Sequence, residues 1–124
     1  MKNLIYIVLI ALLLTGCYTQ ERNCADFKTG KFRFEYEING AKKVTKFERT
    51  EKFEIETFEG TTDTSSVRWV SDCEYILEKL HPKTAAEKKA VQMKILTTKA
   101  DSYTFEFSLV GDTKKQKGTV TKLN

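Results

Sequence analysis

The 124-residue sequence contains one proline, six glycines and one histidine. So few prolines and glycines exclude collagen-like and low-complexity architectures. The single histidine, His81, excludes histidine-rich metal clusters, and any Ser-His-Asp or Cys-His mechanism would depend on it alone. With 40% hydrophobic and 31% charged residues, the composition is typical of a globular domain and excludes a disordered chain or a multi-span membrane protein.

The one long apolar run lies at the N-terminus. Lys2 is followed by uninterrupted apolar residues at 4–14. Since a helix needs about 20 residues to span a bilayer, this run is short for a membrane anchor, and it fits the hydrophobic region of an export signal. It ends in Leu14-Thr15-Gly16-Cys17, which resembles the lipobox of bacterial lipoproteins. That resemblance implies cleavage before Cys17 and the attachment of acyl chains such as palmitate to it.

The lipobox predicts the organisation and location of the chain. We predict a signal peptide at residues 1–16, a lipidated polar tether at 17–26 and a single β domain at 27–124. Two or three acyl chains on Cys17 would hold the protein stably at a membrane. Because Tyr18 and not aspartate follows Cys17, the enteric sorting rule implies the outer membrane, facing the periplasm. The alternatives are an ordinary signal peptide with an incidental cysteine, or an uncleaved anchor.

Two other cysteines remain once Cys17 carries lipid. They are Cys24 and Cys73. The bacterial envelope is oxidising, so we predict a disulfide between them. The alternative is a pair of free thiols.

The body of the chain alternates polar and apolar residues. Residues 31–38 have this period of two, and Asn39-Gly40 is a favoured pair for a two-residue hairpin turn. Such a turn places Phe32 opposite Phe47 and Phe34 opposite Thr45 on the inner side.

Further strands are predicted along the rest of the chain. We expect a strand at 52–58 with Phe53, Ile55 and Thr57 facing inward and Lys52, Glu54 and Glu56 facing outward. Thr84 and Glu87 have the spacing of a capping box, which predicts a short helix at about 84–92. The other expected elements are a loop at 59–65 and strands at 66–78, 93–98, 102–110 and 117–123.

About seven strands joined by short links form an antiparallel up-and-down meander. Its apolar face requires either a small barrel or a strongly curved sheet. An open α+β sheet is the second choice.

Several stretches resemble a family of small exported bacterial lipoproteins. They cover nearly all of the mature chain and include FKTGKFRFEYEING, FERTEKFEIETFEG, VRWVSDCEY and YTFEFSLVGDTKKQKGTV. The resemblance implies no biochemical activity. Members of the family are often labelled as a DNA topoisomerase IV subunit. We reject that activity, and a nucleic-acid partner, because neither a nucleotide-binding nor a DNA-cleavage domain fits into residues 17–124 and the glycines are scattered singly.

The first strand also resembles the start of lipocalin-type barrels at Gly30-Lys31-Phe32. Phe32 replaces the tryptophan of that family, and its closing arginine has no clear counterpart in this sequence.

No residue is predicted to be catalytic or to bind a metal or cofactor. His81 precedes Pro82 and more simply ends a strand than acts as a base. The glutamates at 48, 51, 54, 56 and 59 alternate with Lys46, Arg49 and Lys52, which is typical of a solvated strand face. No loop has the calcium-binding spacing of an EF-hand.

Two kinds of binding remain as functions. We expect a monomeric interaction or structural module that recognises an envelope protein, with Val70 and Ile76 in its contact patch unless the helix covers them. The alternative is a carrier of a small lipophilic ligand, with Thr45, Thr57 and Ser71 as inner polar contacts; a hydrolase ranks third. A filled interior would favour the first, a cavity of several hundred Å³ the second, and a cleft with two nearby carboxylates the third. The side chains that would line such a cavity, or form the core, are Phe32, Phe34, Trp69, Tyr75, Phe105 and Phe107.

Overall fold

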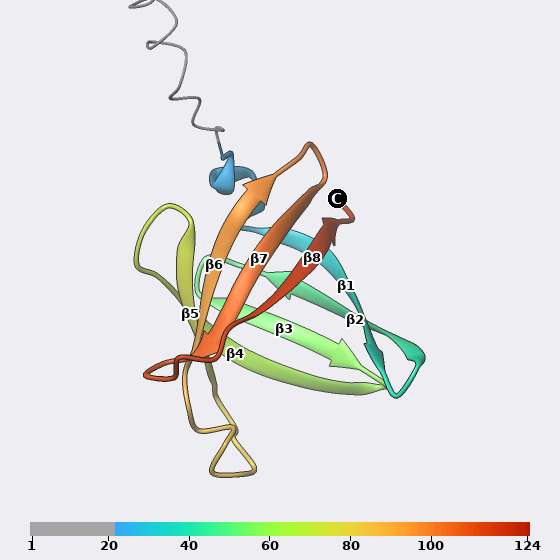
Figure 1. Cartoon of the computed structure of the whole chain (residues 1–124), viewed down its shortest axis with the longest axis vertical. Coiled ribbons are helices and arrows are strands. Elements are labelled where there is room, and N and C mark those ends of the chain that lie inside the picture. The colour runs from blue at the N-terminus through green and yellow to red at the C-terminus, as the bar shows by residue number, and fades with distance from the viewer. Residues whose placement is uncertain (1–21) are drawn as a thin grey trace, which may run out of the picture.

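The computed structural model describes residues 22–124 and shows a closed barrel of eight antiparallel strands in sequence order (Figure 1). The predicted up-and-down meander is confirmed, with eight strands in place of about seven. The predicted signal peptide and Cys17 lie outside the described residues. The elements are η1 (Cys24–Phe27), β1 (Gly30–Ile38), β2 (Ala41–Arg49), β3 (Phe53–Phe58), β4 (Thr61–Trp69), β5 (Glu74–Lys79), β6 (Val91–Thr98), β7 (Ser102–Leu109) and β8 (Gln116–Lys122).

The β1–β2 hairpin has the predicted register. Phe32 lies opposite Phe47 and Phe34 opposite Thr45. The turn residues Asn39 and Gly40 have φ values of 51° and 80°. Both are left-handed, as the two-residue turn that matches strand twist requires.

The second hairpin begins earlier than predicted. Glu59 and Gly60 also have left-handed φ values, 49° and 80°, and β4 starts directly after them at Thr61. The predicted loop at 59–65 is therefore a two-residue turn plus the start of a strand. The predicted strand at 66–78 is in fact two strands, because the chain reverses between Trp69 and Glu74, where the Val70 amide donates to the Glu74 carbonyl.

The faces of β3 are the reverse of the prediction. Phe53 and Ile55 are 41% and 37% exposed, whereas Glu54 is 7% exposed. The Thr50 amide donates to the Phe53 carbonyl over 2.8 Å, so the chain turns at 51–52 and Arg49 lies opposite Glu54. Since Arg49 faces the interior, its partner must do so too. Thr57, predicted on the inner face, therefore faces out.

The predicted helix at 84–92 is a non-helical turn followed by β6. The capping contacts do form: the Glu87 amide donates to Thr84 Oγ1, and the Thr84 amide donates to Glu87 Oε2. The chain nevertheless extends from Val91, which pairs with Leu77 of β5. Because no helix forms there, none covers Val70, which is 47% exposed.

Residues before β1 close one end of the barrel. The short 3-10 helix η1 lies against that end (Figure 1), and its Cys24 and Phe27 are buried in the core. Cys24, which falls within the predicted tether at 17–26, is therefore part of the packed core. The predicted Cys24–Cys73 disulfide is present, with Cα atoms 5.4 Å apart, and it ties η1 to the β4–β5 loop.

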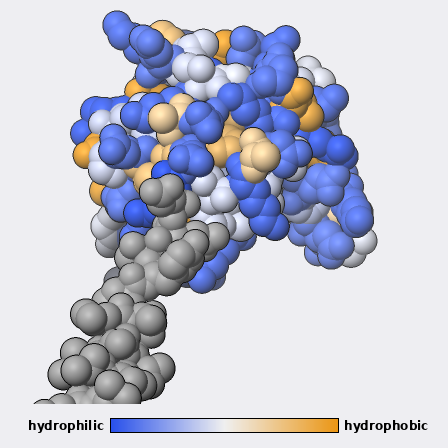
Figure 2. Space-filling view, turned by 90° about the horizontal axis from the view of Figure 1, so that it is seen from above, coloured by the Kyte–Doolittle hydropathy of each residue, from blue (hydrophilic) through white to orange (hydrophobic). Residues whose placement is uncertain are grey.

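The cluster of buried core residues includes Cys24 and Phe27 of η1 together with Phe32, Ile95 and Tyr103. Seen from the η1 end, the surface is largely hydrophilic with small apolar patches (Figure 2). Among residues 22–124, no helix has the length and apolar composition needed to cross a bilayer.

Candidate functional site

A cavity of about 560 Å³ occupies the barrel interior away from η1. Its rim includes Glu37, Gln116 and Lys117, next to the β1–β2 turn and the β7–β8 loop. Glu56 of β3 also lines the cavity and is exposed. The deeper wall consists of aromatic and aliphatic side chains with a few polar ones: Phe34, Tyr36, Thr45, Phe47, Glu54, Tyr75, Leu77, Met93, Tyr103, Phe105, Phe107 and Val120.

Four of the six aromatic residues proposed from the sequence line this cavity: Phe34, Tyr75, Phe105 and Phe107. Phe32 does not, because it is fully buried in the core at the closed end. Trp69 also lies outside the cavity wall. Its ring centroid lies 4.6 Å from that of Tyr75, with the two rings tilted by 45°, and the Lys28 ammonium lies 5.1 Å from its ring centroid.

The polar inner contacts expected from the sequence are only partly present. Thr45 is buried and lines the cavity. Ser71 is exposed in the β4–β5 loop, and Thr57 is on the outer face of β3.

The aromatic wall depends on a glycine in β8. The rings of Phe34 and Phe105 meet edge to face at 5.4 Å, and Phe105 stacks on Phe107 at 5.6 Å. A Cβ atom at Gly118 would lie 2.8 Å from the Phe34 ring and 2.9 Å from the Phe105 ring. Gly118 therefore provides the space that these two rings occupy.

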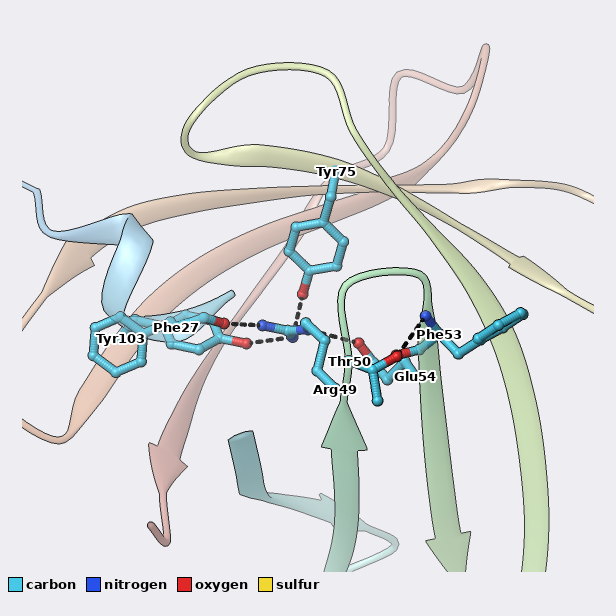
Figure 3. A network of polar contacts seen from close by, with 7 residues as sticks. All are labelled: Phe27, Arg49, Thr50, Phe53, Glu54, Tyr75 and Tyr103. Atoms are coloured by element: carbon cyan, nitrogen blue, oxygen red, sulfur yellow. Dashed lines mark hydrogen bonds and ion pairs between the residues drawn. The ribbon is translucent and has the colours of Figure 1, made fainter. Parts of the chain in front are cut away.

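Arg49 is the centre of a buried polar network that includes the cavity-lining residues Glu54, Tyr75 and Tyr103 (Figure 3). Its Nε donates to Glu54 Oε2 over 3.1 Å and its Nη1 to the Phe27 carbonyl over 2.7 Å. Its Nη2 donates to the hydroxyl oxygens of Tyr75 and Tyr103 over 2.7 and 2.9 Å. One guanidinium thus joins β2 and β3 to η1, β5 and β7.

Aromatic rings surround the same guanidinium. Its Cζ lies 4.6 Å from the Tyr75 ring centroid, 4.8 Å from Phe32 and 5.3 Å from Phe47. Arg49 of β2 therefore places its positive charge over the ring of Phe32. The prediction that Arg49 lies on a solvated strand face is wrong, since its side chain is fully buried.

The protonation states of this network follow from its contacts. Burial alone would lower the pKa of Arg49, but Tyr75, Tyr103 and Glu54 outweigh burial and raise it, so Arg49 stays charged. Burial raises the pKa of Tyr75 and of Tyr103, although Arg49 opposes this, so both phenols stay neutral.

Glu56 is one of three carboxylates that line the cavity, with Glu37 and Glu54. Among residues 22–124, it has no ion-pair or side-chain hydrogen-bond partner, whereas Glu54 is paired with Arg49. Burial, followed by the negative charge of Glu54, raises the pKa of Glu56, and Lys79 counteracts this. Glu54 and Glu56 were both expected on a solvated face. That expectation is wrong for Glu54, which is buried, whereas Glu56 is exposed to solvent although it lies on the inward side of β3.

A second cavity of about 490 Å³ lies between β3–β4 and the β5–β6 loop, with His81 and Glu56 among its lining residues. Lys79 bridges Asp63 at 3.0 Å and Glu87 at 2.9 Å there. His81 follows the end of β5 at Lys79, as expected from the sequence. In the part of the chain that the structure describes, no three His, Cys, Asp or Glu residues are arranged to hold a metal ion.

The charged residues of the site were missed by the sequence analysis. The signal was present, because the inward alternation of Thr45 and Phe47 continues to Arg49. A turn at 51–52 then carries the same face to Glu54 and Glu56.

The chain matches no protein-family model, no curated protein and no solved structure. The function must therefore be argued from the site itself.

Proposed function

We propose that this barrel binds a small amphipathic molecule in its interior cavity. The observation that supports the proposal most directly is the aromatic-lined volume of about 560 Å³. Ligand pockets of about 300–1,000 Å³, mostly apolar with a few convergent polar groups, are typical of small-molecule sites. The carboxylates of Glu54 and Glu56 and the hydroxyl of Thr45 supply such groups here.

The cavity changes the order of the two binding functions expected from the sequence. From the sequence, a filled interior would favour the protein-interaction module over the ligand carrier, and a cavity would favour the carrier. An unfilled interior forgoes packing contacts that would stabilise a small domain. A ligand bound in this space would supply the missing packing contacts.

The two carboxylates also bear on the hydrolase alternative. A glycosidase needs one carboxyl group on each side of the scissile bond. Glu54 and Glu56 project from the same face of one strand, and Glu54 is occupied by Arg49. This arrangement favours binding over hydrolysis.

Recognition of an envelope protein stays a second candidate, because β3 presents apolar side chains to solvent. Phe53 and Ile55 are both exposed on its outer face. Such side chains are enriched in contact surfaces when they cluster.

We further propose that the domain is held at the bacterial outer membrane by acyl chains on Cys17, and the support is the lipobox in the sequence. Cys17→Ser is expected to move the protein from the membrane fraction to the soluble fraction and to abolish labelling with a palmitate analogue. Thr19→Ser, which keeps the lipobox, is the matched control. Equal membrane retention and equal labelling of the Cys17→Ser variant would contradict the anchor.

The ligand-binding proposal predicts that an inward bulky residue blocks the cavity. Leu77 lines it from β5, while Ile76 next to it faces the other side of the barrel wall. Leu77→Trp is expected to weaken binding of the neutral dye Nile red at least about tenfold, equivalent to roughly 1.4 kcal/mol. Ile76→Trp adds the same ring outside and is expected to leave binding unchanged.

Dye fluorescence titration measures both affinities, and thermal unfolding checks that both variants fold. Native mass spectrometry of the protein purified from its own membranes is expected to show a bound small molecule. Absence of dye binding by the folded wild-type protein would refute the cavity as a ligand site.

A further inference from the structure

We propose that the ligand carries a positively charged group, such as an ammonium on an apolar body, and that Glu56, an exposed residue of the cavity lining, binds this group beside the aromatic wall. This inference rests on the proposed ligand-binding function and specifies the chemistry of the ligand.

Two carboxylates that line the cavity, those of Glu37 and Glu56, have no ion-pair partner among residues 22–124. Glu54 pairs with Arg49 at 3.1 Å, and Asp63 pairs with Lys79 at 3.0 Å. Glu56 lies directly opposite Asp63 in the β3–β4 ladder, yet it has no such partner among residues 22–124. The cavity lining therefore holds two carboxylates without an ion-pair partner against one such lysine, Lys117, which leaves a net negative charge.

The nearest cations are already engaged. Lys79 is held by both Asp63 and Glu87, and these contacts raise its pKa. Arg49 makes four hydrogen bonds elsewhere. Lys117 lies on the cavity rim, but it comes from β8, which is separated from β3 by β1 and β2 around the barrel.

The position of Glu56 disfavours an anionic ligand head beside it. Glu54 and Glu56 are two residues apart on one strand face, roughly 7 Å along the strand. A carboxylate or phosphate placed next to Glu56 would therefore meet an unpaired negative charge, with a second carboxylate, already paired with Arg49, close by. A cation would instead offset the burial and the repulsion that raise the pKa of Glu56.

The surrounding rings complement a cation as well. Phe47 lies opposite Glu56 in the β2–β3 ladder and lines the same cavity, as do Tyr36 and Phe34. Aromatic faces attract ammonium groups, and most strongly where water is excluded. A carboxylate combined with aromatic walls therefore suits an amphipathic amine better than a neutral lipid.

Three ligands that share the same alkyl chain and differ in their head group test whether the site prefers a positive charge. Decylamine, 1-decanol and decanoate, each below its aggregation threshold at pH 7, compete with Nile red for the wild-type protein and two variants. Glu56→Gln removes the charge with little change of shape. Glu48→Gln is the control, because Glu48 is an exposed glutamate on the outer face of β2.

The wild-type protein is expected to bind decylamine about tenfold more tightly than 1-decanol, and decanoate most weakly. Glu56→Gln is expected to weaken decylamine about tenfold, to leave 1-decanol unchanged and to keep the dye affinity. Glu48→Gln is expected to match the wild type.

Equal affinities for the three heads, a preference for decanoate, or an unchanged decylamine affinity in Glu56→Gln would overturn the charged-ligand inference. In each of those cases, tail and dye binding would still support the proposed function. If neither dye nor any tail binds to the folded protein, the proposed function and the inference both fall.

Discussion

Arg49→Met is expected to lower the free energy of unfolding by about 3–5 kcal/mol, the usual cost of removing one partner of a buried ion pair. The substitution leaves the Glu54 carboxylate, 7% exposed, without its counterion. It also removes the donors to the Phe27 carbonyl and to the hydroxyls of Tyr75 and Tyr103. Equilibrium unfolding in urea, with the slope compared between variants, measures the change.

A double-variant cycle separates the stranded charge from lost packing. Arg49→Met with Glu54→Gln is expected to be more stable than Arg49→Met alone, because the uncompensated buried charge is gone. Lys46→Met removes a positive charge from the exposed face of the same strand, and its effect is expected to stay within about 0.5 kcal/mol. A loss below about 1 kcal/mol for Arg49→Met would show that this network does not hold the closed end together.

The architecture could be predicted because most strands carry a strong period of two. In β1 and β7, aromatic side chains alternate with polar ones, and Asn39-Gly40 determines the register of the first hairpin. Local chemistry of this kind is present in the sequence itself. The second hairpin turn, Glu59-Gly60, was missed because glutamate rarely adopts a left-handed φ.

The site was harder to predict, because polarity gave the wrong faces for β3. Phe53 and Ile55 are its apolar residues, and an isolated strand would bury them. The short turn at 51–52 instead makes Glu54 the partner of inward-facing Arg49. Hairpin geometry thus outweighs side-chain polarity, and the paired charges of Arg49 and Glu54 make the burial tolerable.

The volume of the interior depends on long-range closure. Whether eight strands enclose a cavity or a filled core is decided by which side chains meet across the barrel. Phe34 and Phe105, which approach over Gly118, are far apart in sequence. No local sequence pattern indicates that these two rings are in contact, so the cavity could only be found from the folded structure.

Removing the disulfide by Cys24→Ser with Cys73→Ser is expected to lower the free energy of unfolding by about 4 kcal/mol, from the chain-entropy cost of a loop of this length. The bridge closes a separation of 49 residues and joins η1 to the β4–β5 loop. Without the bridge, the two residues just before η1 still make hydrogen bonds to β6. Arg22 Nη1 donates to the Ile95 carbonyl and the Asn23 amide donates to Thr98 Oγ1, both over 2.9 Å. Because η1 loses its covalent link to the β4–β5 loop, hydrogen exchange at η1 is expected to accelerate more than exchange in β7.

Urea unfolding of the double variant and of the oxidised wild-type protein gives the stability difference. Reduced wild-type protein is the matched control, since it lacks the bridge but keeps both sulfurs, and it is expected to lose a similar amount. Thiol labelling of the folded, non-reduced protein without Cys17 is expected to find no reactive thiol. Two reactive thiols in that sample would refute the bridge, and a double variant as stable as the wild type would show that the noncovalent contacts of residues 22–27 suffice to close the barrel.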